Sequence, residues 1–512
     1  MMKLFQVSLR EKLDIHPRDL QLISRNLRRV DQKFRRMREV NDAFLDILMS
    51  PHNPELTLRH MSEVGLLGKY MPDFARVTGQ MQFDMYHIYT VDEHILRVVG
   101  ILHDIGKGKF AKEMPVATEV MPLIHSPKIL FVAAFTHDIA KGRGGEHAVK
   151  GGEIAHTFAL QLGLSKTNAE TVAMLVENQE LLTETAFKRD LGDPETYRHL
   201  AASIRSIETL RLLFLLTVGD VRAVGPNVWN GWKGLLLRDL YRRAEQYFQT
   251  GSIAAGAHAK ADIQKAMISI LGTSSEDSIA AYLSIVDDAY LSSRDAQSHA
   301  TVIKLIEDCK KNRTATGIDF SSNEFHDMTD MIVVAEDRYG LLADVAGAIS
   351  SADANIVGAR IATLKSGWAV QSWQIQDLGK HAVIEAELMQ RIRARIEQAV
   401  TEPHKTILPK RSLASKLKPL ERQTEVFVNN DYSSTYTIIE INALDRLGLL
   451  STICRTLQEE GFNIASAYIS TYGEKAVDVF YIKDRYGFKI NHPQRIEALT
   501  NQLVTDIEKL KL

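Results

Sequence analysis

The sequence contains few cysteines and no long apolar run. Only Cys309 and Cys454 occur in 512 residues, and they lie far apart in the chain. This excludes a disulfide framework and a cysteine-based zinc site, and it favours a reducing compartment. No apolar run reaches the roughly 20 residues that a membrane helix needs, and the first residues lack the apolar segment of a signal peptide. We therefore expect a cytoplasmic protein without a membrane partner.

The chain also carries almost no net charge. The formal charge is −2, so the overall balance favours no class of charged partner. A basic run between Arg25 and Arg38 could contact nucleic acid, but a solvated helix face is the better interpretation. We expect no nucleic-acid partner. At 512 residues the chain is too long for one core, and two to four domains are expected.

One stretch organises the rest of the chain. The apolar run from Ile129 to Thr136 ends in the pair His137-Asp138, and a glycine-rich turn begins at Gly142. A neutral imidazole beside an ionised carboxylate suits a divalent cation. An isolated pair could equally be a helix-end aspartate and a hydrogen-bonded core histidine. Other residues of the chain must decide between these interpretations.

Two further residues favour a metal site. Thr90 and Glu93 occupy the spacing of a capping box, which predicts a helix with His94 in its first turns. Asp220 shares the apolar face of a later helix with Leu216, where a carboxylate needs a cation or hydrogen-bond donors. With the His-Asp pair, these residues complete a set of four nitrogen and oxygen ligands.

A second His-Asp pair, His103-Asp104, nearly duplicates the first. If His94 and His103 lie on one helix, the nine-residue spacing puts them on opposite sides, where they cannot share a metal. The later pair, His137-Asp138, follows a stronger apolar run and is followed by glycines. We therefore interpret His137-Asp138 as the functional pair.

The order His94, His137-Asp138, Asp220 resembles the signature of the HD phosphohydrolase superfamily. The resemblance implies an all-α bundle in which separate helices supply ligands to Mg²⁺ or Mn²⁺. In that superfamily the metal activates water for attack on phosphorus. The resemblance further implies that Lys141 neutralises phosphate charge and that His147 binds phosphate or transfers a proton.

The C-terminal part contains an internal repeat. Asp337–Leu342 recurs as Asp445–Leu450, and Asn355-Ile356 recurs as Asn463-Ile464, each with a shift of 108 residues. In each copy a β-rich segment precedes the first motif, and a helix, two strands and a final helix follow. The pattern predicts two α+β modules of the ferredoxin-like type, βαββαβ.

Each copy resembles the ACT domain, a module that usually binds amino acids at paired copies. The turn before each helix would present backbone N–H groups to a ligand carboxylate. The glycine in this turn lets the backbone approach the ligand closely. The two copies could instead be purely structural modules. The predicted amino-acid ligands are Asp337, Gly340, Leu341, Asn355, Ile356, Asp445, Gly448, Leu449, Asn463 and Ile464.

Longer stretches resemble the bacterial bifunctional uridylyltransferase/uridylyl-removing enzymes, which modify the nitrogen-regulatory PII protein. These stretches are Met81–His87, Tyr89–His94, His137–Gly145, Trp229–Lys233, Asn463–Ala467 and Tyr472–Lys475. The resemblance implies a phosphodiester hydrolase that removes UMP from uridylylated PII, under the control of glutamine bound by the two ACT domains. We find no Gly-Ser followed by Asp-x-Asp, so we expect the nucleotidyltransferase domain to be missing.

The resulting division is a helical linker region at 1–80, an HD domain at 81–310, and ACT domains at 328–402 and 434–512. Lys310–Gly317 and 403–419 are interpreted as linkers.

Two alternatives to the hydrolase remain. One is a catalytically impaired, glutamine-sensing regulatory remnant, because Asn178 and Gln179 stand where the family usually carries a histidine pair. The other is an alarmone hydrolase, a class that also combines HD and ACT domains. Ile139 and Ala140 disfavour it, because that class carries a Glu-Asp pair after its His-Asp motif.

Overall fold

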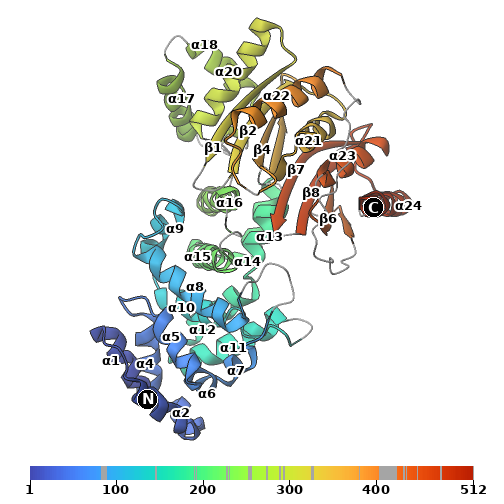
Figure 1. Cartoon of the computed structure of the whole chain (residues 1–512). Helices are drawn as coiled ribbons and strands as arrows, with labels where there is room; N and C mark the ends of the chain where they lie inside the picture. The colour runs from blue at the N-terminus through green and yellow to red at the C-terminus, as the bar shows by residue number, and fades with distance from the viewer. Residues whose placement is uncertain are drawn as a thin grey trace. The chain divides into compact units, whose positions relative to one another are not determined.

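The computed structural model describes the chain except residues 82–88, 144–146, 190, 192, 226–228, 230, 252–256, 273–274, 287–289, 292–294, 324–327, 380, 403–423, 431–432, 434, 447, 473–474 and 511–512. The predicted linker at 403–419 therefore lies outside the described residues, as do parts of the stretches on which the family resemblance rests (82–87, 144–145, 230 and 473–474). The chain forms two compact units (Figure 1). Unit 1 comprises Met1–Ala186 and His199–Gln249, and unit 2 comprises Phe187–Arg198 and Thr250–Leu512.

The described residues of unit 1 form helices joined by turns and loops, without a strand. Its helices are α1 (Met2–Glu11), α2 (Pro17–Arg25), α3 (Gln32–Arg36), α4 (Arg38–Leu48), α5 (Glu55–Glu63), α6 (Leu66–Tyr70), α7 (Pro72–Val77), α8 (Val91–Gly106), α9 (Pro115–Val120), α10 (Pro127–Thr136), α11 (His147–Gln161), α12 (Lys166–Glu177), α15 (Ile207–Ala223) and α16 (Gly231–Thr250). Helices α13 (Leu181–Lys188) and α14 (Pro194–Ile204) each carry residues of both units, and the last residue of α16, Thr250, belongs to unit 2. Two short 3₁₀ turns, at Leu27–Arg29 and Met121–Leu123, complete the set.

Helix α10 is the core of unit 1. Every residue from Ile129 to Thr136 is buried, which is expected of a helix that is apolar on all sides. It packs against α8, α12 and α15. The apolar run that precedes His137 is therefore a central helix, and the His-Asp pair leaves its C-terminal end inside the core.

Aromatic rings tie the N-terminal helices of unit 1 to α10. Phe135 packs against Phe44 and Phe158, with ring centroids 5.2 and 6.0 Å apart, and stacks on Phe74 at 5.4 Å. Tyr70 contacts Phe44 at 5.0 Å. Phe135 is fully buried at the centre of this cluster.

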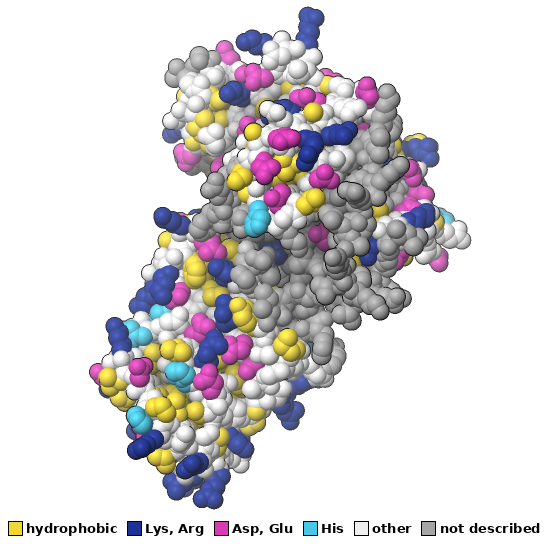
Figure 2. Space-filling model, in the orientation of Figure 1, with side chains coloured by type: hydrophobic (Ala, Val, Ile, Leu, Met, Phe, Trp, Pro, Cys, Tyr) yellow, Lys and Arg dark blue, Asp and Glu magenta, His cyan; other side chains and the backbone are white. Residues whose placement is uncertain are grey.

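The basic run of the N-terminal region lies on the surface. Its members Arg28, Arg29 and Arg36 are exposed, as expected of a solvated helix face. On the visible face of unit 1, acidic and basic side chains are mixed (Figure 2).

Unit 2 contains two four-stranded antiparallel sheets. The first has the order β1-β2-β4-β3 and the second β5-β6-β8-β7. The strands are β1 (Thr316–Asn323), β2 (Met328–Glu336), β3 (Asn355–Thr363), β4 (Trp368–Gln376), β5 (Glu425–Asn429), β6 (Thr437–Leu444), β7 (Phe462–Tyr472) and β8 (Lys475–Asp484). The helices are α17 (Ala257–Leu271), α18 (Glu276–Ile285), α20 (Ala296–Asn312), α21 (Leu341–Ser351), α22 (Ala386–Thr401), α23 (Leu449–Glu459) and α24 (Pro493–Lys509).

The predicted fold class is confirmed: a helical region precedes two ferredoxin-like modules. The fourth strand of each sheet, however, comes before the first predicted strand rather than after the last helix. The linker interpretation of Lys310–Gly317 is wrong, because α20 continues to Asn312 and β1 begins at Thr316. Strand β1 is an edge strand with few apolar residues, so its sequence carries little strand signal.

Sheet 1 is covered on both faces. Helices α21 and α22 pack on one face, where Trp373 is fully buried. Helices α17, α18 and α20 pack on the other face against Val334 and Val370. Strand β4 is therefore buried along nearly its whole length, because alternate residues point to opposite faces and both faces are covered.

The two modules pack against each other. Strand β3 lies beside β7 and helix α21 lies beside α23, and one cluster of buried apolar side chains runs through both modules. The start of unit 2 also contacts sheet 2: the Tyr481 hydroxyl donates to the Lys188 carbonyl at 3.0 Å, and Lys188 pairs with Glu440 at 3.0 Å. Among the described residues, no helix has the length and apolar character needed to cross a bilayer.

Candidate metal centre

Two central helices of unit 1, and the turn that follows a third, supply the four predicted ligands. Helix α8 begins at Val91, as predicted, and carries His94 in its first turn. The chain leaves α10 at Thr136 and places His137 and Asp138 in the following turn. Helix α15 carries Asp220 in its last turn. Because α8, α10 and α15 pack together, residues separated by up to 126 positions meet in one place.

The predicted capping box at the start of α8 is wrong. The Thr90 side chain makes no capping hydrogen bond, and Glu93 instead pairs with Arg59 of α5. The helix start is held by Asp92, whose side chain accepts from the Gly79 N–H at 3.0 Å. A carboxylate in the first turn is also favoured by the helix dipole.

The four side chains converge. His94 Nε2 lies 2.9 Å from Asp220 Oδ1 and 3.2 Å from His137 Nε2. Asp138 Oδ2 lies 3.5 Å from His137 Nε2 and 3.7 Å from His94 Nε2. His94, His137 and Asp138 are all buried and form a group that could hold a metal ion. The structure thus brings all four predicted ligands together.

Electrostatics keep these groups in the protonation states that bind a cation. Burial lowers the pKa of His94 despite the two neighbouring carboxylates, so its imidazole is neutral at pH 7. Burial alone would raise the pKa of Asp138. The positive charge of Lys141 outweighs it and holds the pKa of Asp138 well below its usual range.

Lys141 is partly buried beside the cluster. Its Nζ lies 2.7 Å from Asp138 Oδ2. Burial opposes its charge, but the carboxylates of Asp138 and Asp220 outweigh this and raise the pKa of Lys141 above its ordinary value. Lys141 is therefore a fixed cation beside the carboxylate.

His147 lies outside the buried cluster. It is exposed at the start of α11. Burial raises the pKa of the neighbouring Glu180 above its ordinary value, and Lys141 offsets this only in part. Its predicted role in catalysis remains a proposal.

The turn after the His-Asp pair is fixed by two contacts. Gly142 has a φ of +79°, and a Cβ there would overlap the side chain of Gln80. Both features favour glycine. Arg143 pairs with Asp73 of α7 at 2.6 Å. These contacts fix the backbone that presents Lys141.

Gln179 is a site residue whose role the sequence did not reveal. Its Nε2 donates to Asp138 Oδ1 at 3.3 Å, and the residue is buried. The neighbouring Asn178 instead caps α12, because its Nδ2 donates to the Met174 carbonyl at 2.8 Å. From the sequence we interpreted both amides as poor metal ligands. In the structure Gln179 is instead a hydrogen-bond partner of Asp138. The only signal in the sequence was the position of Gln179 beside a helix end.

The second His-Asp pair is separate from this cluster. His103 Nε2 lies 3.2 Å from the Pro51 carbonyl oxygen. Asp104 pairs with Lys109 at 2.9 Å and accepts from Asn53 at 3.2 Å. Both residues therefore have structural partners of their own.

Comparisons with known proteins show what the chain is similar to. A family model described as the third domain of uridylyltransferase GlnD matches residues 1–70, and the ACT domain model matches residues 437–487. The bifunctional uridylyltransferase/uridylyl-removing enzyme of Azospirillum brasilense is 38% identical over 98% of this chain. Those of Rhodospirillum rubrum and Novosphingobium aromaticivorans are 36% identical over 98% and 38% identical over 100% of the chain.

This chain is a homologue of the bifunctional uridylyltransferase/uridylyl-removing enzymes. It spans about half the length of the curated relatives it matches: 55%, 54% and 56% of the three named. The alignment with the Azospirillum brasilense enzyme includes both units, because it extends over 98% of this chain.

Proposed function

We propose that this chain is a metal-dependent hydrolase that removes UMP from a uridylylated PII-type protein. The observation that supports this most is the convergence of His94, His137, Asp138 and Asp220, of which the first three are buried. The kinship with enzymes named as uridylyl-removing points to the same reaction. Removal of UMP breaks the bond between phosphorus and the tyrosine oxygen, with water as the nucleophile.

The donor set fits Mg²⁺ or Mn²⁺. Two imidazoles and two carboxylates would hold the ion, with Gln179 orienting the Asp138 carboxylate. When bound, such an ion polarises a phosphoryl oxygen and lowers the pKa of water. Lys141 would stabilise negative charge that develops on the phosphoryl group. His147, exposed at the start of α11, would donate the proton that the leaving tyrosine oxygen takes up.

The ACT modules would supply control by glutamine. The turns at Gly340 and Gly448 each begin a helix of 11 residues, and the free N–H groups of a helix N-terminus favour a carboxylate. Binding of an amino acid there would favour one state of unit 2 over another, which is the requirement for regulation.

A glutamine sensor without turnover is the second candidate. The amide of Gln179 beside Asp138 favours it, because an amide is a weaker metal ligand than imidazole. In that case the chain binds glutamine, and also the PII-type protein, but releases no UMP.

Incubation with uridylylated PII protein, Mn²⁺ and glutamine distinguishes these candidates. We expect UMP release that EDTA abolishes and added Mn²⁺ restores, measured by chromatography of the nucleotide. Glutamine binding without UMP release would leave the sensor as the supported function. UMP release that persists in EDTA would contradict the proposed metal centre.

The hydrogen bond from Gln179 gives a separate prediction. Gln179→Ala should lower UMP release by about 10- to 100-fold, the usual effect of losing a residue that orients a metal ligand. Asn178→Ala is the matched control, since Asn178 caps α12 and does not contact Asp138 in the described structure. Equal rates for the two variants would show that Gln179 does not position Asp138.

A further inference from the structure

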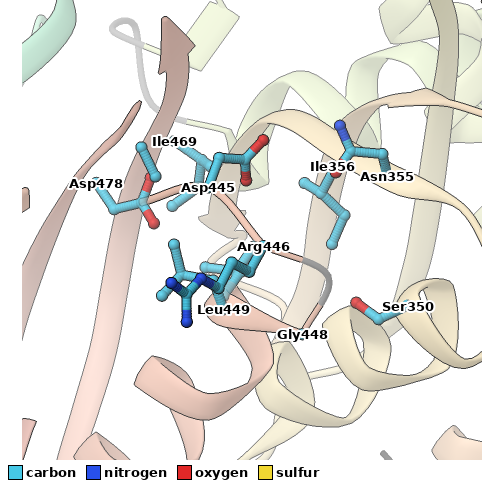
Figure 3. A pocket seen from close by; sticks show the side chains of 11 residues that line it. Ser350, Asn355, Ile356, Asp445, Arg446, Gly448, Leu449, Ile469 and Asp478 are labelled. Atoms are coloured by element: carbon cyan, nitrogen blue, oxygen red, sulfur yellow. The ribbon is translucent and has the colours of Figure 1, made fainter. Parts of the chain in front are cut away.

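The repeat makes two potential amino-acid sites, and the structure shows that they differ. One pocket lies between the two modules of unit 2 and is partly open to solvent. Module 2, which contains β5–β8, contributes Gly448, Asp445 and Asp478 to the lining (Figure 3). Module 1, which contains β1–β4, contributes Ser350 and Asn355. Predicted ligands from both copies therefore meet in this pocket.

The equivalent place on the other side is covered. A shift of 108 residues relates Gly340 to Gly448 and Ser350 to Gln458. A Cβ on Gly340 would overlap the Gln458 side chain, and its three nearest atoms are the Nε2, Cδ and Oε1 of that amide. The Tyr339 hydroxyl also donates to the Gln458 carbonyl oxygen. The module 1 turn is thus covered by the end of α23.

Charge also distinguishes the two places. Asp478 pairs with Ile469 across β7 and β8, and it is a buried carboxylate of the open pocket. In module 1 the residue that pairs with the equivalent Ile361 is Gln371. A carboxylate can pair with the ammonium group of an amino acid, whereas a neutral amide cannot supply that charge. Figure 3 shows the carboxylates of Asp445 and Asp478 at the pocket.

We infer that the ACT pair has one working amino-acid pocket, at the module 2 turn, and that the side chain of Gln458 fills the equivalent place at the module 1 turn. Gln458 ends in the same carboxamide as free glutamine, so it is a built-in occupant of that place. Ser350 is too short to do the same in the open pocket. This inference rests on the proposed control by amino acids and specifies where that control begins.

Calorimetric titration of the full chain with L-glutamine tests the inference. We expect one molecule bound per chain, and binding at least about tenfold weaker in Ser350→Gln, which places an amide in the open pocket. Asp478→Asn, which keeps the side-chain shape, should also weaken binding at least about tenfold, because the charged partner is lost. Glu459→Ser, at the exposed neighbour of Gln458, is the control and should bind as the unaltered chain does.

Opening the second place is the converse experiment. Gln458→Ser with Gln371→Asp should raise the stoichiometry from one to two. Two molecules bound by the unaltered chain, or binding lost in Gln458→Ser but retained in Ser350→Gln, would overturn the inference. Absence of any glutamine binding would overturn it too, without affecting UMP release. Loss of UMP release with one glutamine bound would instead contradict the proposed hydrolysis alone.

Discussion

Asp138→Ala should abolish turnover, lowering UMP release by at least about 100-fold. Residues that merely orient a metal ligand already cost about 10- to 100-fold when removed, and Asp138 lies in the cluster itself. Its Oδ2 is within 3.7 Å of both His94 and His137. The substitution also removes the carboxylate that lies 2.7 Å from the partly buried Lys141. Glutamine binding, which depends on unit 2, should stay near that of the unaltered chain.

Two further variants make this prediction specific. Asp138→Asn keeps the side-chain volume and removes the charge, so it should lose activity without leaving a cavity. Asp104→Ala is the matched control, because Asp104 belongs to the second His-Asp pair and contacts Lys109 and Asn53 instead. UMP release is the readout, with the Mn²⁺-induced rise in melting temperature as a second one. Full activity in Asp138→Ala would mean that the metal centre lies elsewhere.

Phe135→Ala should produce the largest loss of stability in unit 1. The ring is fully buried and contacts Phe44, Phe74 and Phe158. Truncating a buried phenylalanine costs about 3–5 kcal/mol, because transfer free energy is lost and a cavity remains. For a unit of this size, such a loss lowers the melting temperature by about 10 °C. Differential scanning calorimetry measures the change.

The position of Phe135 on α10 gives this variant a second effect. The helix ends one residue later and leads into His137, so loosening it should also weaken the Mn²⁺-induced stabilisation. Leu123→Ala is the control, because that side chain is about half exposed and should change the stability by less than about 0.5 kcal/mol. If both variants melt alike, the aromatic cluster does not support α10.

The sequence predicted the structure best at positions where the residue type allows only one kind of environment. The apolar run before His137 has few alternatives to a core helix, and Asp220 on an apolar face needs a partner. The constant shift of 108 residues revealed the two modules. Edge strand β1 was missed because Ile318 and Phe320 are its only large apolar residues.

Contacts between distant segments were not predictable in the same way. Gln179 reaches Asp138 across 41 residues, and no spacing along one helix or strand encodes that distance. The covering of Gly340 by Gln458 depends on how α21 packs beside α23, which neither repeat copy determines alone. The capping box predicted at the start of α8 does not form, because Glu93 pairs with Arg59, 34 residues away. Tertiary partners can override such local patterns.

The apolar cluster that runs through both modules makes them one cooperative block. Ile349 and Ala359 of the first copy belong to the same continuous interior as Ile453 and Ala467 of the second. Removing either copy would expose the apolar side chains that it now covers, and the remaining fragment would fold poorly and aggregate. A glutamine biosensor made from this protein must therefore contain both ACT modules.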